Sequence, residues 1–376
     1  MASSRTLSFS VPALCALGGV LIAVAVLPAT LGANRQANSR TGKQIFEASC
    51  AQCHGVNGTG NHKTAVGFDQ PLPNLADCNY TREADADWFA IIHNGGPVRA
   101  FSRLMPSFGE ALTGQEIHAV IGYVRTFCAS RSWPRGELNF PRALVTEKAF
   151  PEDEAMFVSA VATGGPGEVA NTMIFEKRLG TRSQLEVIVP FSSIEADTGG
   201  WGTGIGDVAF GAKSTLYHNK GAGTIFSVGT EVGLPTGNAD RGFGSGHTTV
   251  EGFAAFGQAL PGSAFLQAQA GLGVPTDGST KEAYWRLVFG RTIIQRDFGR
   301  MWSPMVELVA TRDLADGQAS LWDIVPQFQV TLSRRQHVRV ALGAQVPLNE
   351  RDSRHTQVVA YFLWDWYDGG LFSAWK

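Results

Sequence analysis

The sequence carries little charge for its length, and neither sign is in excess. Only 17% of its 376 residues are Asp, Glu, Lys or Arg, and the formal net charge is −2. Without a surplus of one sign, long-range electrostatics favour neither nucleic acid nor an acidic membrane surface as a partner. Outside one cysteine motif, general acid–base or nucleophilic groups at a recognisable spacing are missing, so an enzyme with its own substrate is not favoured.

Cysteine is equally scarce, with five residues in the chain. Cys50 and Cys53 belong to a C-x-x-C-H run that ends in His54. Two thiols at this spacing lie on one helical turn and can both bond the vinyl groups of one porphyrin, while the histidine ligates the iron. A zinc site would need two further ligands, and thioredoxin-like chemistry would need a βαβ context; neither is visible. The run therefore predicts one covalently bound haem c.

Methionine is rare near this motif, which narrows the choice of a second iron ligand. Met105 is the only methionine between residues 2 and 155, and Pro106 follows it. The proline stiffens the loop, which helps to hold a thioether on the iron, and His/Met ligation closes the iron to small ligands. We expect His54 and Met105 as the axial ligands. The alternatives to Met105 are His62, His93 and His118, which are more often core or solvated residues.

The region around these ligands resembles a class I cytochrome c over residues 41–128. The resemblance rests on the haem motif, on the loop that runs from Met105 through Pro106 to Phe108, and on a final helix with Tyr123. Hydrophobic periodicity predicts helices over 43–50, 83–93 and 113–127. The resemblance implies an all-helical fold around one haem and electron transfer through the exposed haem edge.

The N-terminus predicts export of the chain. A basic residue and an apolar run precede small residues, which is typical of a signal peptide, here over residues 1–33. The alternative is an uncleaved membrane anchor, which prolines and a glycine pair in the run disfavour. Either segment exports the chain, and an oxidising compartment permits a disulfide between the remaining pair, Cys78 and Cys128. Two unpaired buried thiols are the alternative.

The second half of the chain lacks soluble-type helices. Residues 129–153 are polar and contain several prolines, which indicates an interdomain linker. From residue 154 onward, side chains alternate with a period of two over stretches of about ten to fourteen residues, a length suited to tilted membrane strands. Short and long connections alternate, as in outer-membrane barrels. Five tryptophans lie near the expected strand ends: Trp285, Trp302, Trp322, Trp364 and Trp366.

We therefore expect a transmembrane antiparallel β-barrel of about 12 strands over residues 154–376. A soluble β-sandwich is the alternative. The segment from Gly204 to Lys213 and the later run from Glu231 to Gly237 resemble porin-like barrels of phenol-degradation pathways. Several charged residues are expected to form a solvated pore lining rather than a catalytic set: Glu186, Lys213, Glu231, Arg286, Glu307 and Arg339.

Together these features predict a multidomain chain, with a periplasmic mono-haem cytochrome over 34–128 and an outer-membrane barrel. The expected function is electron transfer between periplasmic donor or acceptor proteins and the outer membrane or cell exterior. The alternative is a channel for a small organic solute, with the haem domain as redox sensor or docking module.

The architecture resembles fused cytochrome–porin iron oxidases but departs from them in its methionine loop and shorter barrel. A single haem below the mouth also leaves most of the hydrocarbon thickness uncrossed.

Overall fold

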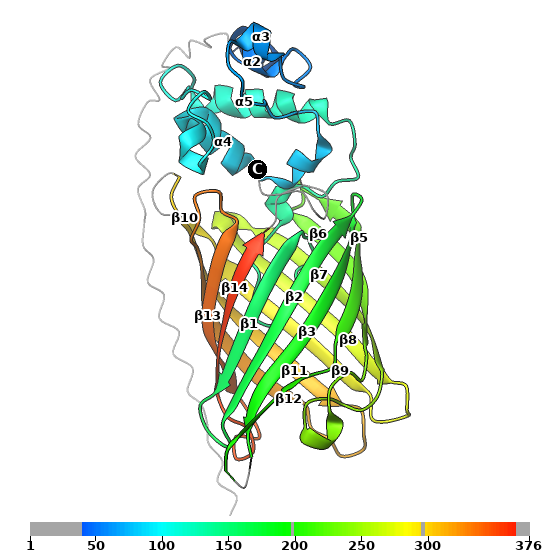
Figure 1. Cartoon of the computed structure of the whole chain (residues 1–376). Coiled ribbons are helices and arrows are strands. Elements are labelled where there is room, and N and C mark those ends of the chain that lie inside the picture. Colours follow the sequence, from blue (N-terminus) through cyan, green and yellow to red (C-terminus); the bar gives the residue numbers. More distant parts are fainter. Residues whose placement is uncertain (1–39, 197–198, 295–297, 366–376) are drawn as a thin grey trace, which may run out of the picture. The chain divides into compact units, whose positions relative to one another are not determined.

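The computed structural model describes residues 40–196, 199–294 and 298–365. The expected signal segment and Trp366 lie outside these residues. Within the described ranges, no helix is long and apolar enough to cross a membrane. The described chain consists of a helical segment (residues 40–128), a connecting stretch, and a β-barrel that begins at residue 154 (Figure 1).

The helical segment contains the three helices that the sequence predicts. Capping boxes fix the starts of α1 and α5, where Thr41 and Thr113 each accept a hydrogen bond from the amide three residues on. The elements are α1 (Gly42–Ser49), α2 (Ala51–His54), α3 (Lys63–Val66), η1 (Cys78–Arg82), α4 (Asp85–Asn94), η2 (Gly96–Arg99), α5 (Gly114–Val124) and η3 (Arg125–Phe127).

The first and last helices of the segment cross in close contact. Ile45 and Phe46 of α1 pack in one buried cluster with Ile117 of α5. At the crossing, a Cβ on Gly42 would lie 1.9 Å from the carbonyl oxygen of Ala119, so only glycine allows the backbones to approach this closely. The crossing positions α2, which follows α1 directly and carries the haem motif.

A disulfide braces the end of this segment. Cys78 at the start of η1 and Cys128 just after η3 are bonded, with 5.1 Å between their Cα atoms. Because 50 residues separate them in the sequence, the bond ties the end of the last helix to the middle of the segment.

The β-barrel is closed and antiparallel. Fourteen strands are described, of which β4 and β10 are short and pair only with β3 and β11, and the other 12 form the closed wall. The pairs β1–β14 and β9–β11 close the ring, and the predicted strand number is confirmed. The strands are β1 (Glu154–Ala162), β2 (Glu168–Leu179), β3 (Ser183–Glu195), β4 (Trp201–Ile205), β5 (Ala209–Asn219), β6 (Thr224–Gly233), β7 (Thr249–Leu260), β8 (Ala264–Pro275), β9 (Glu282–Arg291), β10 (Ile293–Ile294), β11 (Met301–Asp313), β12 (Leu321–Thr331), β13 (Val338–Pro347) and β14 (Gln357–Asp365).

The polarity of the barrel is the reverse of that of a soluble sheet protein. Large apolar side chains point outward, and polar side chains are buried inside, which is the pattern of a barrel in lipid. The alternative of a soluble β-sandwich is therefore wrong. Exposed apolar residues include Phe157, Leu185, Phe210, Leu216, Phe289, Leu342 and Phe362. Buried polar residues include Glu176, Gln184, Glu186, Lys213, Gln267, Gln269, Glu307, Gln327 and Gln329.

Tryptophans mark both ends of the wall. Trp302 and Trp364 lie at the end of the barrel with the short turns, where β11 begins and β14 ends. Trp285 and Trp322 lie near the starts of β9 and β12, at the long-loop end, and their rings meet edge to face at 4.5 Å. Two aromatic belts are a feature of membrane barrels.

Much of the stretch that the sequence predicts as an interdomain linker is buried. After η4 (Gly136–Leu138), residues 139–153, called the inner segment below, lie largely buried within the barrel. Phe140 stacks on Phe265 of β8, and Phe150 belongs to the same buried cluster. The barrel lumen is therefore occupied by the chain's own backbone.

Candidate functional site

The haem motif lies on α2, where a folded-back loop fixes its last turn. The amide of Gly60 donates to the carbonyl oxygen of His54 at 2.7 Å, and the amide of Asn61 donates to that of Cys53 at 2.8 Å. The Asn61 side chain donates to the carbonyl oxygens of Ala51 and Gln52. These bonds satisfy carbonyl groups at the C-terminal end of the turn and hold it in one conformation.

The residues of this motif fit a haem c. Cys50 and Cys53 are both free thiols, and Cys50 packs against the apolar cluster of the segment. His54 is largely buried, and its Nδ1 has no hydrogen-bond partner among the described residues. Burial also lowers the pKa of His54, which favours the neutral imidazole that metal ligation requires. The cluster around the motif includes the partly buried side chains of Leu75, Trp88, Ile92 and Phe108.

Met105 lies in a loop that backbone bonds fix against the end of α4. Its carbonyl oxygen accepts from the amide of Gly96 at 3.0 Å, and the amide of Phe108 donates to Ile92 at 2.9 Å. A Cβ on Gly96 would lie 2.2 Å from the carbonyl oxygen of Ser102, so glycine permits this close packing. The loop that carries the expected thioether ligand is thus fixed to the end of α4 and to η2.

The alternative histidine ligands make other contacts. The Nδ1 of His62 accepts from the amide of Thr64 at the start of α3. His93 lies within hydrogen-bond distance of Asn94, and its ring stacks on Phe89 at 5.7 Å. His118 also packs its ring against Phe89. The choice of Met105 as the second ligand stays a prediction.

The helical segment contacts the barrel at three short turns. Lys220, between β5 and β6, forms ion pairs with Asp85 and with Glu137, the latter at 2.9 Å. The Arg99 side chain donates to the carbonyl oxygen of Phe298 at 2.9 Å, between β10 and β11. Arg335, between β12 and β13, donates to the carbonyl oxygen of Ala100 at 3.2 Å and its guanidinium lies over the Phe101 ring.

Asp85 is the electrostatic centre of this contact. Burial alone would raise the pKa of its carboxyl group, but the hydrogen bond from Lys220 and the charges of Arg125 and Arg135 outweigh burial. Together they lower the pKa from 3.8 to about 2. The carboxylate therefore stays ionised at neutral pH and links the helical segment to the turn.

The charged residues inside the barrel hold the inner segment instead of lining an open pore. Glu307 is completely buried and accepts hydrogen bonds from the amides of Val145 and Thr146 at 3.1 and 2.8 Å. Arg286 donates to the carbonyl oxygen of Val145, and Lys213 is buried in an ion pair with Glu147. The expectation of a solvated lining is wrong for these residues, because the sequence does not reveal the segment that they bind.

Further wall residues complete this attachment. The amide of Leu144 donates to Gln327, that of Glu147 to Gln269, and that of Glu152 to Gln184, over 2.7 to 3.1 Å. The backbone polar groups of the inner segment are thus satisfied by side chains from many strands, as burial requires. One signal was present in the sequence: glutamines recur on the lumen side of β3, β8 and β12.

Two family models match the chain. Residues 37–124 match "Cytochrome C oxidase, cbb3-type, subunit III", and residues 156–293 match "MetA-pathway of phenol degradation". The chain joins a cytochrome c segment to a porin-like barrel. The resemblance expected from the sequence to a cytochrome c and to phenol-degradation-type barrels is confirmed. No curated protein matches the sequence.

Several solved structures resemble the barrel. An outer-membrane channel from Pseudomonas putida F1 is 15% identical, with a TM-score of 0.42, over 60% of this chain and 99% of that chain. The β domain of the Bordetella autotransporter BrkA is 12% identical, with a TM-score of 0.37, over 57% of this chain and 98% of that chain. The KdgM porin is 8% identical, with a TM-score of 0.38, over 57% of this chain and 99% of that chain.

Proposed function

We propose that this protein is an electron carrier of the bacterial outer membrane. Its helical segment would hold one haem c, bonded to Cys50 and Cys53, with His54 and Met105 as axial ligands of a class I cytochrome. The observation that carries the proposal is the C-x-x-C-H turn of α2, with the buried and unpartnered Nδ1 of His54 beside two free thiols.

The chain's own residues would prepare the site for one-electron transfer. Haem c supplies a reversible one-electron couple when bound. The bonds from Gly60 and Asn61 hold the turn with His54, and those from Gly96 hold the loop with Met105. A loop fixed in this way would keep the second ligand in place in both oxidation states. The apolar cluster would exclude water, which tunes the potential through the local dielectric.

The polarity of the barrel supports its location in the outer membrane. The contacts of the helical segment with the short turns support a periplasmic location for that segment. Short turns face the periplasm in barrels of this kind. The helical segment contacts three short turns, so it would lie on the periplasmic side after removal of a signal peptide over residues 1–33. Soluble periplasmic electron donors or acceptors would be its partners.

A channel for a small organic solute is the second candidate. The observation that favours it is the match of residues 156–293 with the phenol-degradation family. In this case the helical segment would act as redox sensor or docking module. The buried inner segment opposes free passage through the lumen, since Glu307 and the wall glutamines hold it in place. Solute passage would therefore require these bonds to break.

Two assays on the same pair of proteins separate the candidates. Whole cells with the wild-type chain should exchange electrons with a membrane-impermeant reporter, and cells with Cys50→Ser/Cys53→Ser should not. Uptake of small phenolic solutes into liposomes should be low for both proteins. Equal reporter rates in the two strains, with solute uptake that persists without haem, would support the channel and overturn the electron carrier.

A further inference from the structure

Acidic residues on the lumen face lie opposite one another in consecutive strands. The register pairs Glu176 with Glu186 and Glu231 with Glu251, so each pair shares one face of the wall. Gly211 lies between Glu186 and Glu231 in the same row, and Gly273 lies between Glu251 and Glu282. The acidic members of this row, called the acidic track below, are Glu176, Glu186, Glu231, Glu251, Glu282 and Asp313.

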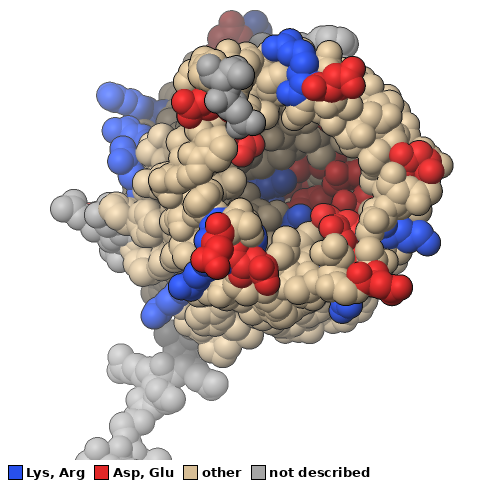
Figure 2. Space-filling model, turned by 90° about the horizontal axis from the view of Figure 1, so that it is seen from below, with Lys and Arg blue, Asp and Glu red and all other residues tan. Residues whose placement is uncertain are grey.

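The acidic track leads from the long-loop mouth into the barrel. Asp313 and Glu282 are exposed, and they lie at the ends of β11 and β9 next to long loops. Glu176, at the other end of the track, is completely buried near the short-turn end of β2. Figure 2 looks into the long-loop mouth and shows acidic side chains gathered on one side of its hollow. A cation that enters this mouth would meet carboxylates along the way.

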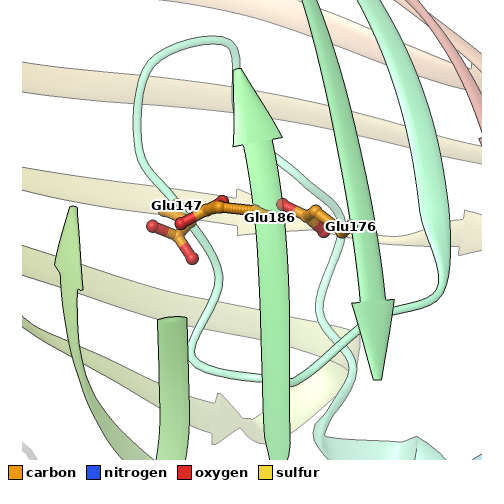
Figure 3. A group of neighbouring side chains, drawn as sticks. All are labelled: Glu147, Glu176 and Glu186. Atoms are coloured by element: carbon orange, nitrogen blue, oxygen red, sulfur yellow. The ribbon is translucent and has the colours of Figure 1, made fainter. Parts of the chain in front are cut away.

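At its inner end, the track meets a carboxylate from the inner segment. Oxygen atoms of Glu147, Glu176 and Glu186 lie within 4.8 Å of one another, and the three side chains turn toward one another in Figure 3. All three are buried, with 7%, 0% and 4% of their surface exposed. Like charges directly opposite in a sheet are destabilising, and more so where water is absent. Bound protons or a positive charge must therefore offset this repulsion.

The side chain of Glu186 makes no direct contact with a cation among the described residues. Among the described residues it receives neither a hydrogen bond nor an ion pair, and its Oε1 is buried. The Oε2 of Glu176 is likewise buried without a partner, although its Oε1 accepts from Arg142 at 2.6 Å. Gly211 leaves room for the carboxylate of Glu186, since a Cβ at position 211 would lie 2.2 Å from Oε1 of Glu186. Two of the three residues of the cluster thus each have a buried carboxylate oxygen without a partner among the described residues.

The surrounding ion pairs do not balance the charge. Three cations, Arg142, Lys148 and Lys213, are paired with four carboxylates of this buried network, and Glu186 adds a fifth. Two negative charges are therefore left over if all the groups are ionised. The four paired carboxylates are Glu147, Glu152, Glu154 and Glu176.

We propose that Glu147, Glu176 and Glu186 bind one hard divalent cation inside the barrel, which reaches them along the acidic track from the long-loop mouth. Carboxylate oxygens alone suit Mg²⁺, Ca²⁺ or Mn²⁺ better than softer metals. A divalent ion supplies the two missing positive charges and gives the free oxygens of Glu176 and Glu186 a ligand. Because Glu147 belongs to the inner segment, the ion joins this segment to β2 and β3. The site does not depend on haem.

Mn²⁺ binding to the purified full chain in detergent tests the site. After chelator treatment, titration followed by electron paramagnetic resonance should show one buried Mn²⁺ per chain, which Ca²⁺ in excess competes away. Glu186→Gln, which keeps the shape of the side chain, should weaken binding by about tenfold or more. The matched control is Asp316→Asn, in an exposed loop, which should bind as the wild type does.

The proposal is overturned if the folded wild type retains no stoichiometric Mn²⁺ or Ca²⁺, in which case the carboxylates share protons. It is also overturned if Glu186→Gln binds as tightly as the wild type. Heat-dependent gel mobility, which reports an intact barrel, would verify that each variant is folded. If Glu186→Gln does not fold, Glu147→Gln replaces it, with the same loss of affinity expected.

The route has a separate test. Glu231→Gln removes a carboxylate of the track that does not belong to the three-residue cluster. It should slow Mn²⁺ association several-fold at low ionic strength and leave one ion bound per chain at saturation. An unchanged association rate would show that the ion does not follow the acidic track.

Discussion

Lys220, in the turn between β5 and β6, donates a hydrogen bond to the carboxylate of Asp85 at the start of α4. The same carboxylate accepts from Arg125 at 3.1 Å and from Arg135 at 2.8 Å. One side chain of the helical segment thus connects its own last turn, the connecting stretch and the barrel. These charges lower the pKa of Asp85, so the contact depends on pH.

Asp85→Asn should remove that dependence. Because the pKa of Asp85 is lowered from 3.8 to about 2, its stabilising contribution is complete above about pH 4 and is lost as the pH falls toward 2. The thermal midpoint of the helical segment, followed by haem absorbance, should be lower for Asp85→Asn than for the wild type at pH 6. The two midpoints should converge near pH 2. A difference that does not change with pH would contradict this role.

Replacement of the disulfide should destabilise the helical segment alone. In the chain-entropy model, a bond that closes a loop of 50 residues contributes about 4 kcal/mol. Cys78→Ser/Cys128→Ser should therefore lower the unfolding free energy of the helical segment by about that amount in urea titrations. Heat-dependent gel mobility of the barrel should stay as in the wild type. Loss of both signals together would mean that the two parts unfold as one unit.

Glu307→Ala should release the inner segment. The substitution leaves the buried amides of Val145 and Thr146 without acceptors, at a cost of about 1–3 kcal/mol for each group. Water would enter the lumen to satisfy them, so single-channel conductance in planar bilayers should rise above that of the wild type. The matched variant Glu307→Gln retains one acceptor oxygen. Its conductance should lie between those of the wild type and Glu307→Ala. Equal conductance of all three proteins would show that Glu307 does not hold the lumen closed.

Met105→Ala should lower the reduction potential of the haem. Loss of a thioether ligand removes its stabilisation of the ferrous state, with an expected fall on the order of 0.1 V, within the ~0.8 V range that axial ligands span. Redox titration of the full chain measures the change. Met173→Ala, on the outward face of β2, is the control and should leave the potential unchanged. A potential and spectrum of Met105→Ala equal to those of the wild type would exclude the methionine as ligand.

Local patterns in the sequence were sufficient for most of the fold. Period-two alternation in β12 correctly places Ile324 and Phe328 on one face of the strand and Asp323, Gln327 and Gln329 on the other. The last three side chains are all buried in the lumen. Strand length and turn spacing were sufficient to predict the number of strands. The C-x-x-C-H run could be found in the sequence because its residues lie within one helical turn, and haem attachment to it stays a prediction.

The interior of the barrel could not be predicted in the same way. The inner segment has no helix or strand period, and its partners, such as Glu307 and Gln269, are more than a hundred residues away in the sequence. The proximity of Glu176 and Glu186 depends on strand register, and that of Glu147 on the path of the inner segment. Such long-range relationships leave no local pattern, so Glu307 was expected to be solvated although it is buried.

Vectorial electron transfer in proteoliposomes is the decisive test of this chain as an electron carrier. The purified full chain is reconstituted, a reductant is supplied on the side of the helical segment, and an impermeant acceptor is placed on the other side. We expect acceptor reduction at least about tenfold faster with the wild type than with Cys50→Ser/Cys53→Ser, which lacks both thiols for haem attachment. Equal rates with the two proteins would contradict its role as an electron carrier.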